Sequence, residues 1–210
     1  MINFLLGLIL LVSLPARDSV TFEGKIELVE KSYYSTTYYT YVIKNNNIRV
    51  DKFDQNHLNI QSLLVNIENQ QLVVLSPSKK LFTYLKLSPS PQIRHDQFTV
   101  IKTNNIRQVN GTDCVQWRVR NEEQNTEITY WVAQNNFYFF NDFIKLLNRT
   151  EATFNFFEII PDTQGFFPLL TVERTLLRKE KRRISVVEIN PQKISDKTFT
   201  IPPDYKEVKN

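Results

Sequence analysis

The stretch FYFFNDFIKLLNRTEATFNFFEII, residues 137–160, is the one part of this chain with a sustained helical pattern of apolar residues. Apolar side chains recur there at the i, i+3, i+4 and i+7 spacing of one helical face, namely Phe140, Phe143, Ile144 and Leu147. From Ser19 onward, the remaining chain mostly alternates apolar and polar residues, as half-buried strands do. The sequence therefore predicts a mainly β fold whose sheet is covered by one or two short helices.

Short β-rich runs, separated by turn signals, indicate an antiparallel meander. The Asn-Gly pair at 110–111 predicts a tight hairpin turn, after which Val115, Trp117 and Val119 fall on one face of a strand. Residues 128–132 are expected to form its partner strand. Gly24, inside the first alternating run, predicts a kink or a close approach of another chain segment.

The N-terminal segment FLLGLILLVSL, residues 4–14, is apolar and uncharged. As a helix it would span about 16 Å, roughly half of a bilayer's hydrocarbon core, so it is too short to cross a membrane. We interpret residues 1–16 as a signal peptide and residues 17–210 as a single periplasmic or secreted domain. The alternative is a buried first strand or helix. Cys114 is the only cysteine, so the sequence has neither a lipobox cysteine nor an internal disulfide.

The charge balance of 26 basic against 22 acidic residues gives a net charge of +4, too small for a dedicated nucleic-acid binder. We therefore expect no nucleic-acid partner. The positive charge is local, and the candidate membrane-surface residues are Arg178, Lys179, Lys181, Arg182 and Arg183. This basic run predicts either peripheral contact with an anionic membrane surface or a solvated hairpin tip whose charges block edge pairing.

Aromatic residues are abundant, with 15 Phe, nine Tyr and two Trp. Each can bury roughly 150–250 Å², so the aromatic surface near residues 137–160 exceeds what one short helix needs for docking. The excess predicts either a groove for an acyl chain or a large closed core. For the groove, the candidate ligand-binding residues are Phe140, Phe143, Ile144 and Leu147 on the helix and Val115, Trp117 and Val119 on the sheet.

Motifs for catalysis or cofactor binding are missing from the sequence. Four glycines cannot build a phosphate-binding loop, and no GxSxG, HExxH or CxxC motif occurs. His57 near Asp51 and Asp54, and the pair at 95–96, are better explained as surface residues than as a metal or base site. Cys114 is expected to be a buried, inert thiol. We therefore predict a non-enzymatic protein with no cofactor and no metal.

An ordered set of motifs carries a family resemblance. It comprises FEGKI at 22–26, YVIK at 41–44, IRV at 48–50, VNGTDC at 109–114, the strand at 126–133 ending in WVA, the apolar helix, GFFPL at 165–169 and FTIPPDYK at 199–206. In this order the chain resembles DUF4412, a domain of unknown function found in exported bacterial proteins, notably of Bacteroidetes. The resemblance spans nearly all of the predicted mature chain.

The resemblance implies a lipoprotein-carrier (LolA/LolB-like) architecture, in which a strongly curved antiparallel half-barrel has helices across its concave side. It also implies a role in moving or holding lipophilic molecules across the periplasm. This sequence departs from the pattern because it lacks a lipobox cysteine and because its helical cover is short and rich in Phe.

Together these features predict a monomeric, exported envelope protein that binds a lipophilic small molecule, or the acyl chain of a lipoprotein, between sheet and helix. The alternative is a structural or assembly protein that docks another envelope protein through its sheet edges or its Tyr-rich segment 33–41. Acyl chains that copurify with the protein would favour the first hypothesis, and a stoichiometric protein partner would favour the second.

Overall fold

The fold is described from a computed structural model, which covers residues 21–89, 94–148 and 155–209. Its strands are β1 (Gly24–Ser32), β2 (Thr36–Lys44), β3 (Asn47–Phe53), β4 (Asn59–Asn66), β5 (Gln71–Ser76), β6 (Leu81–Tyr84), β7 (Phe98–Val109), β8 (Thr112–Asn121), β9 (Thr126–Gln134), β10 (Phe166–Arg174), β11 (Glu180–Pro191) and β12 (Lys206–Glu207). The helices are α1 (Phe139–Asn148) and α2 (Asn155–Glu158), with short 3-10 turns at His95–Gln97 and Asp196–Phe199.

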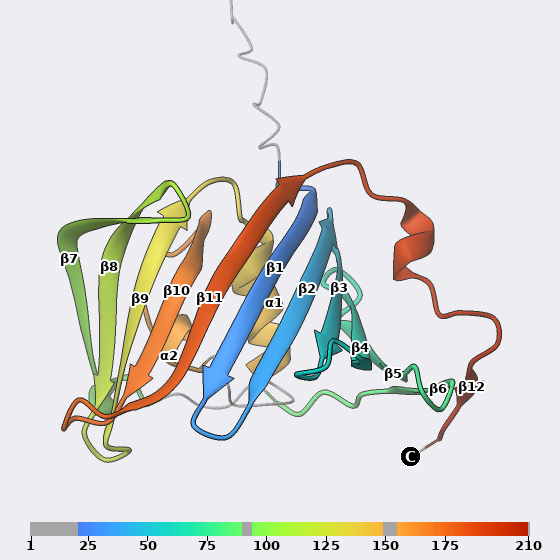
Figure 1. The fold of residues 1–210 in the computed structure, drawn as a ribbon, viewed down its shortest axis with the longest axis horizontal. Helices are drawn as coiled ribbons and strands as arrows, with labels where there is room; N and C mark the ends of the chain where they lie inside the picture. Colours follow the sequence, from blue (N-terminus) through green and yellow to red (C-terminus); the bar gives the residue numbers. More distant parts are fainter. Residues whose placement is uncertain (1–20, 90–93, 149–154, 210) are drawn as a thin grey trace, which may run out of the picture.

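All twelve strands belong to one curved sheet in the order β12-β6-β5-β4-β3-β2-β1-β11-β10-β9-β8-β7 (Figure 1). Two meanders, β1 to β6 and β7 to β11, are joined by the antiparallel pairing of β1 with β11. Neighbouring strands are antiparallel throughout, except that β12 lies parallel to β6. The predicted mainly β, curved antiparallel sheet is therefore confirmed.

The β7–β8–β9 hairpins follow the sequence pattern closely. Asn110 and Gly111 both have positive φ, 50° and 76°, which matches the backbone of a tight hairpin turn. In β8 and β9, Val115 pairs with Val132 and Trp117 with Tyr130, so the apolar residues of both strands share one face. Side chains two apart in a strand point to the same side of the sheet. The observed pairing of β8 with β9 therefore confirms the predicted strand pair.

Both helices lie between β9 and β10 in sequence and cover the concave face of the sheet (Figure 1). Their phenylalanines form the centre of the core, and the Phe140 ring lies 4.6 Å from that of Phe167 and 5.2 Å from that of Phe157. The predicted cover of one or two short helices is confirmed. Residues 149–154, part of the predicted helical stretch, lie outside the described residues.

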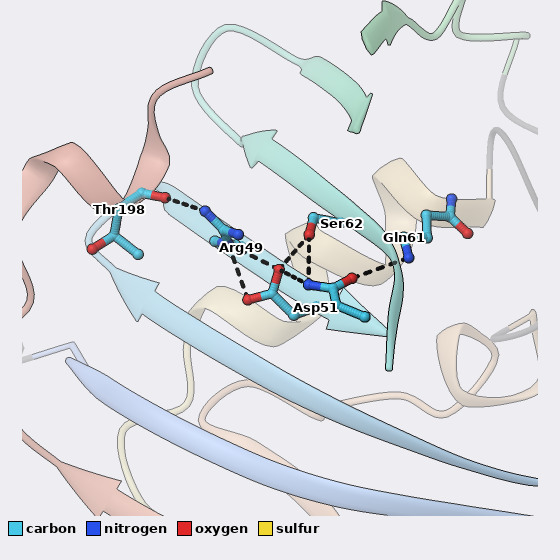
Figure 2. A network of polar contacts seen from close by, with 6 residues as sticks. Arg49, Asp51, Gln61, Ser62 and Thr198 are labelled. Carbon is cyan, nitrogen blue, oxygen red and sulfur yellow. Dashed lines mark hydrogen bonds and ion pairs between the residues drawn. The ribbon is translucent and has the colours of Figure 1, made fainter. Parts of the chain in front are cut away.

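After β11 the chain crosses the opposite face of the sheet and reaches its far edge at β12 (Figure 1). We call residues 192–205 the strap. The Lys44 Nζ donates to the Ile194 carbonyl at 3.0 Å, and the Arg49 guanidinium donates to the Thr198 carbonyl at 3.2 Å (Figure 2). Ile201 and Tyr205 of the strap pack on a small second core, which consists of Leu64, Val73 and Leu75.

The C-terminal edge strand, β12, is only two residues long. Pro202 and Pro203 lie in the strap, before β12 begins at Lys206. Proline has no N–H to donate to a neighbouring strand, so the pairing with β6 starts only after both prolines.

Gly24 makes the predicted close approach. It lies beside Pro191 at the β1–β11 pairing, and a Cβ built at this position would clash with the carbonyl oxygen of Asn190 and the Cα of Pro191. Only glycine leaves this backbone contact free of overlap.

The predicted signal peptide, residues 1–16, lies outside the described residues. Among the helices of the described part of the chain, none has the length and apolar character needed to span a bilayer.

Candidate functional site

A pocket of about 380 Å³ lies between α1 and the concave face of the sheet. Its walls come mainly from β1 to β5, β10, β11 and α1, and most of the side chains that line it are apolar. Binding pockets for small molecules are typically about 300–1,000 Å³ and mostly apolar, with a few placed polar groups. The space beneath the helix is therefore not completely filled by side chains.

On the sheet, the pocket residues fall into two neighbouring rows. In the apolar row, Val50 pairs with Tyr41 on β2 and with Leu63 on β4. In the polar row, two residues further along each strand, Lys52 pairs with Tyr39 and with Gln61. Residues two apart in a strand share a face, so both rows face α1. The pocket therefore has an apolar part and a polar part, arranged along the strands.

The apolar row meets α1 through aromatic rings. The ring of Tyr41 lies 5.7 Å from that of Phe143 at an interplanar angle of 74°, an edge-on contact. Both side chains are buried, and burial raises the pKa of the Tyr41 hydroxyl well above its ordinary value. Tyr41 therefore stays a neutral phenol and provides a largely apolar surface at this end of the pocket.

The polar part of the pocket contains a charged network. The Tyr39 hydroxyl donates to the Glu30 carboxylate at 3.0 Å, and the Arg182 guanidinium lies 3.7 Å from the same carboxylate. Arg182 also contacts Glu173 at 3.0 Å. Burial, together with the negative charge of Glu30, raises the pKa of Tyr39 far above its ordinary value. The Glu30 carboxylate is thus held by a phenol donor and a guanidinium.

Three of the four predicted helix residues line the pocket: Phe140, Phe143 and Leu147. Ile144 is buried on another side of α1, where it borders a separate and more polar cleft with Asn141 and Lys145. The helical periodicity thus identified the buried face correctly, but only part of that face borders the pocket.

The predicted sheet residues Val115, Trp117 and Val119 lie on the concave face but do not border this pocket. Trp117 packs on Phe166, with ring centroids 4.8 Å apart, and Lys102 lies over its ring at 4.5 Å. Val119 is completely buried in the main core. The structure therefore does not bring these three residues together with Phe143 around one cavity, and their role in ligand binding stays a prediction.

The sheet residues that do line the pocket, such as Leu28, Val50 and Leu63, were not predicted as site residues. Their strands show apolar–polar alternation, which indicates that one face is buried. Predicting these residues requires the strand order of the sheet. The sequence does not show that β2 and β3, and not β8, lie beneath α1. A register prediction for β1 to β4 is the signal that could have found them.

The basic run lies at the β10–β11 hairpin, as predicted, but most of its charges are paired. Arg178 contacts Glu127 at 2.8 Å and Arg183 contacts Glu180 at 2.8 Å. Lys181 and Arg182 share Glu173, at 3.8 Å and 3.0 Å, whereas Lys179 lies 6.0 Å from the centre of the Tyr33 ring. Membrane contact by Arg178, Lys179, Lys181, Arg182 and Arg183 stays a prediction.

The carboxylates near His57 have local bonding roles. Asp51 accepts hydrogen bonds from Arg49 and Ser62 (Figure 2), and Asp54 accepts the N–H groups of Asn56 and Leu58 at 2.9 Å each. His57 stacks on Tyr38, with ring centroids 4.2 Å apart. In the described part of the chain, His, Cys, Asp and Glu form no group of three or more that could hold a metal ion.

Cys114 is fully buried, as predicted. Burial, with a smaller contribution from the charge of Asp113, raises the pKa of its thiol to about 11. The thiolate is the reactive form of cysteine, so at neutral pH this side chain is a protonated thiol with little nucleophilic character.

Comparison with known protein families confirms the resemblance to DUF4412. DUF4412, a domain of unknown function, matches residues 22–205. This chain belongs to the DUF4412 family. The match covers every strand of the sheet except β12, so the fold described above is that of the family domain. No curated protein resembles the chain closely enough in sequence to count as a match.

Among solved structures, an uncharacterized conserved protein from Thermus thermophilus has 10% identity and a TM-score of 0.51, over 90% of this chain and 91% of that chain. A chain of the MucA/MucB complex of Pseudomonas aeruginosa has 8% identity and a TM-score of 0.52, over 89% of this chain and 58% of that chain. This chain thus corresponds to little more than half of the chain from that complex. The matches also include a putative outer membrane lipoprotein-sorting protein domain from Vibrio parahaemolyticus, with 6% identity and a TM-score of 0.32, over 84% of this chain and 87% of that chain.

Proposed function

We propose that this protein is an exported, non-enzymatic envelope protein that binds a lipophilic ligand, or the lipid group of a modified partner, between α1 and the sheet. The observation that carries the proposal is the mostly apolar pocket of about 380 Å³ beneath α1. An acyl chain in this pocket would gain about 0.8 kcal/mol for each CH₂ group removed from water. Affinity would therefore come from buried apolar area.

The chemistry of the pocket supports binding more than catalysis. Its carboxylate, Glu30, accepts a hydrogen bond from the Tyr39 hydroxyl and lies beside the Arg182 guanidinium, so its charge is compensated within the protein. Tyr39 is kept protonated by burial and by Glu30. Glu30, Tyr39 and Arg182 thus provide one another's hydrogen-bond and charge partners. Buried polar groups beside an apolar pocket are stable only when they have such partners.

Export is supported by the signal-peptide pattern of residues 1–16. Mass spectrometry of the protein from its own host tests this part, because cleavage predicts a mature chain that begins at Arg17.

A substitution that fills the pocket tests binding most selectively. Leu63→Trp adds apolar volume to a half-buried position on the pocket wall without removing a core side chain. Uptake of a neutral fluorescent naphthylamine probe should fall at least about tenfold, while the far-UV spectrum stays unchanged. Phe143→Asp is less selective, since Phe143 is completely buried and a carboxylate there would unfold the core. Unchanged probe uptake by folded Leu63→Trp would reject this pocket as the binding site.

A second candidate function is a structural or assembly protein that acts through protein–protein contacts. The observation in its favour is the β1–β2 turn, where Tyr33 is 81% and Tyr34 is 91% exposed, next to the β10–β11 turn with Leu177 90% exposed. Clustered exposed apolar side chains are typical of protein contact sites. Native mass spectrometry from the host distinguishes the candidates: a stoichiometric protein lost in Tyr34→Ser supports assembly, and bound lipid supports the carrier.

A further inference from the structure

Lys52 brings a cation to the pocket without an acidic partner. Its side chain lines the pocket from the polar row, and its ammonium lies 6.0 Å from the centre of the Tyr39 ring. Among the described residues, no carboxylate forms an ion pair with Lys52, whereas Arg178, Lys181, Arg182 and Arg183 each have one. Lys52 is therefore available to a ligand.

Gln61 places an amide beside this cation. It pairs directly with Lys52 across β3 and β4, and its side chain points away from Asp51 and Ser62 on the other face of the strand (Figure 2). The nearby carboxylate of Glu30 is compensated by Arg182 and accepts the Tyr39 hydroxyl. The polar row thus offers one unpaired positive charge and the N–H donors of an amide.

We propose that the ligand of this pocket is a single-chain amphiphile with an anionic head group, carboxylate or phosphate. This inference rests on the proposed function and names its ligand class. The head group lies against Lys52 and Gln61, and the hydrocarbon chain runs over the apolar row toward Phe143. A charge-assisted hydrogen bond from an ammonium to an anionic oxygen fixes the orientation of the chain. The pocket volume is near the lower end of the range for ligand pockets, which suits one chain better than two.

The test compares ligands that share one chain and differ in the head group. Hexadecanoate, hexadecyl phosphate and hexadecanol each displace a neutral naphthylamine probe from the purified protein at about pH 8, where both anionic head groups are charged. We expect at least one of the two anionic ligands to bind up to about fivefold more tightly than hexadecanol, as one half-exposed charge interaction provides. If hexadecanoate binds more tightly than hexadecyl phosphate, the head group of the ligand is a carboxylate; if hexadecyl phosphate binds more tightly, it is a phosphate.

Lys52→Met should remove this preference and leave the affinity for hexadecanol within about twofold. Lys31→Met is the matched control, because Lys31 is exposed and follows Glu30 in β1, so it points to the opposite face. Lys31→Met should bind the anionic ligand more tightly than hexadecanol by the same factor as the wild type. Equal binding of all three ligands, or a preference that persists in Lys52→Met, overturns this inference and leaves the carrier function standing. Failure of all three to displace the probe rejects the carrier function as well.

Discussion

The ring of Tyr41 on β2 meets the ring of Phe143 on α1 edge-on, with centroids 5.7 Å apart, and both border the pocket. This contact joins the sheet to its helical cover at the buried side of the cavity. The helix is thus docked by phenylalanines that also form the pocket wall. The same residues therefore contribute to stability and to ligand binding. A variant that tests binding must reduce ligand affinity and leave the free energy of unfolding unchanged.

Val50→Phe is expected to reduce ligand uptake without destabilising the protein. Val50 is half-buried in the apolar row, so the larger ring can enter the cavity rather than overpack the core. We expect at least about a tenfold loss of probe affinity and a free energy of unfolding within about 1 kcal/mol of the wild type. Val187→Phe, at a side chain that is 56% exposed, is the control and should bind the probe normally.

Gly24→Ala should be strongly destabilising because the new methyl group would overlap the backbone of Asn190 and Pro191, which cannot rotate away. We expect a loss of about 2 kcal/mol or more in urea unfolding. Gly111→Ala is the comparison: its φ is also positive, but nothing lies within 4 Å of the added Cβ, so its cost should be about 1 kcal/mol. Equal effects of the two variants would contradict the close approach at Gly24.

Arg49→Ala should loosen the strap. The Arg49 guanidinium lies 2.9 Å from Asp51 and donates to the Thr198 carbonyl, and the side chain of Asp51 is only 15% exposed (Figure 2). Removal of the guanidinium leaves the largely buried carboxylate of Asp51 without its cation, so we expect a loss of about 2 kcal/mol and faster backbone hydrogen exchange in the strap. Lys80→Ala breaks an exposed ion pair with Asp204 and should leave the unfolding midpoint unchanged.

Cys114 should make stability fall at alkaline pH. Its folded pKa of about 11 lies above the ordinary value of 9.0, so the folded state holds the thiol proton more tightly than the unfolded state does. This contribution is complete below about pH 9 and is lost as the pH rises through about 11. Cys114→Ala should show a smaller loss of thermal stability from about pH 9 to 11 than the wild type. Rapid reaction of the native thiol with a disulfide reagent at about pH 7 would contradict its burial.

Much of the fold could be predicted because its decisive patterns are local. The alternation of Val115, Trp117 and Val119 and the Asn110–Gly111 turn predict β8 and its hairpin, and the Phe140–Leu147 spacing predicts α1. The site could be predicted only on the helix side. Which strands lie beneath α1 depends on the pairing of β1 with β11, and the strap is held by contacts such as that of Lys44 with the Ile194 carbonyl. These pairings join distant parts of the chain, and no local period encodes them.

The most direct test of the account uses stearate that carries a nitroxide near its methyl end, bound to protein with isotopically labelled methyl groups. If the chain binds beneath α1, the strongest paramagnetic broadening falls on the methyl signals of Val50 and Leu63, with weaker effects at the exposed side chains of Ile106 and Val187. Broadening that is strongest at Ile106 or Val187, or no broadening at Val50 and Leu63, would show that the pocket beneath α1 does not hold the chain.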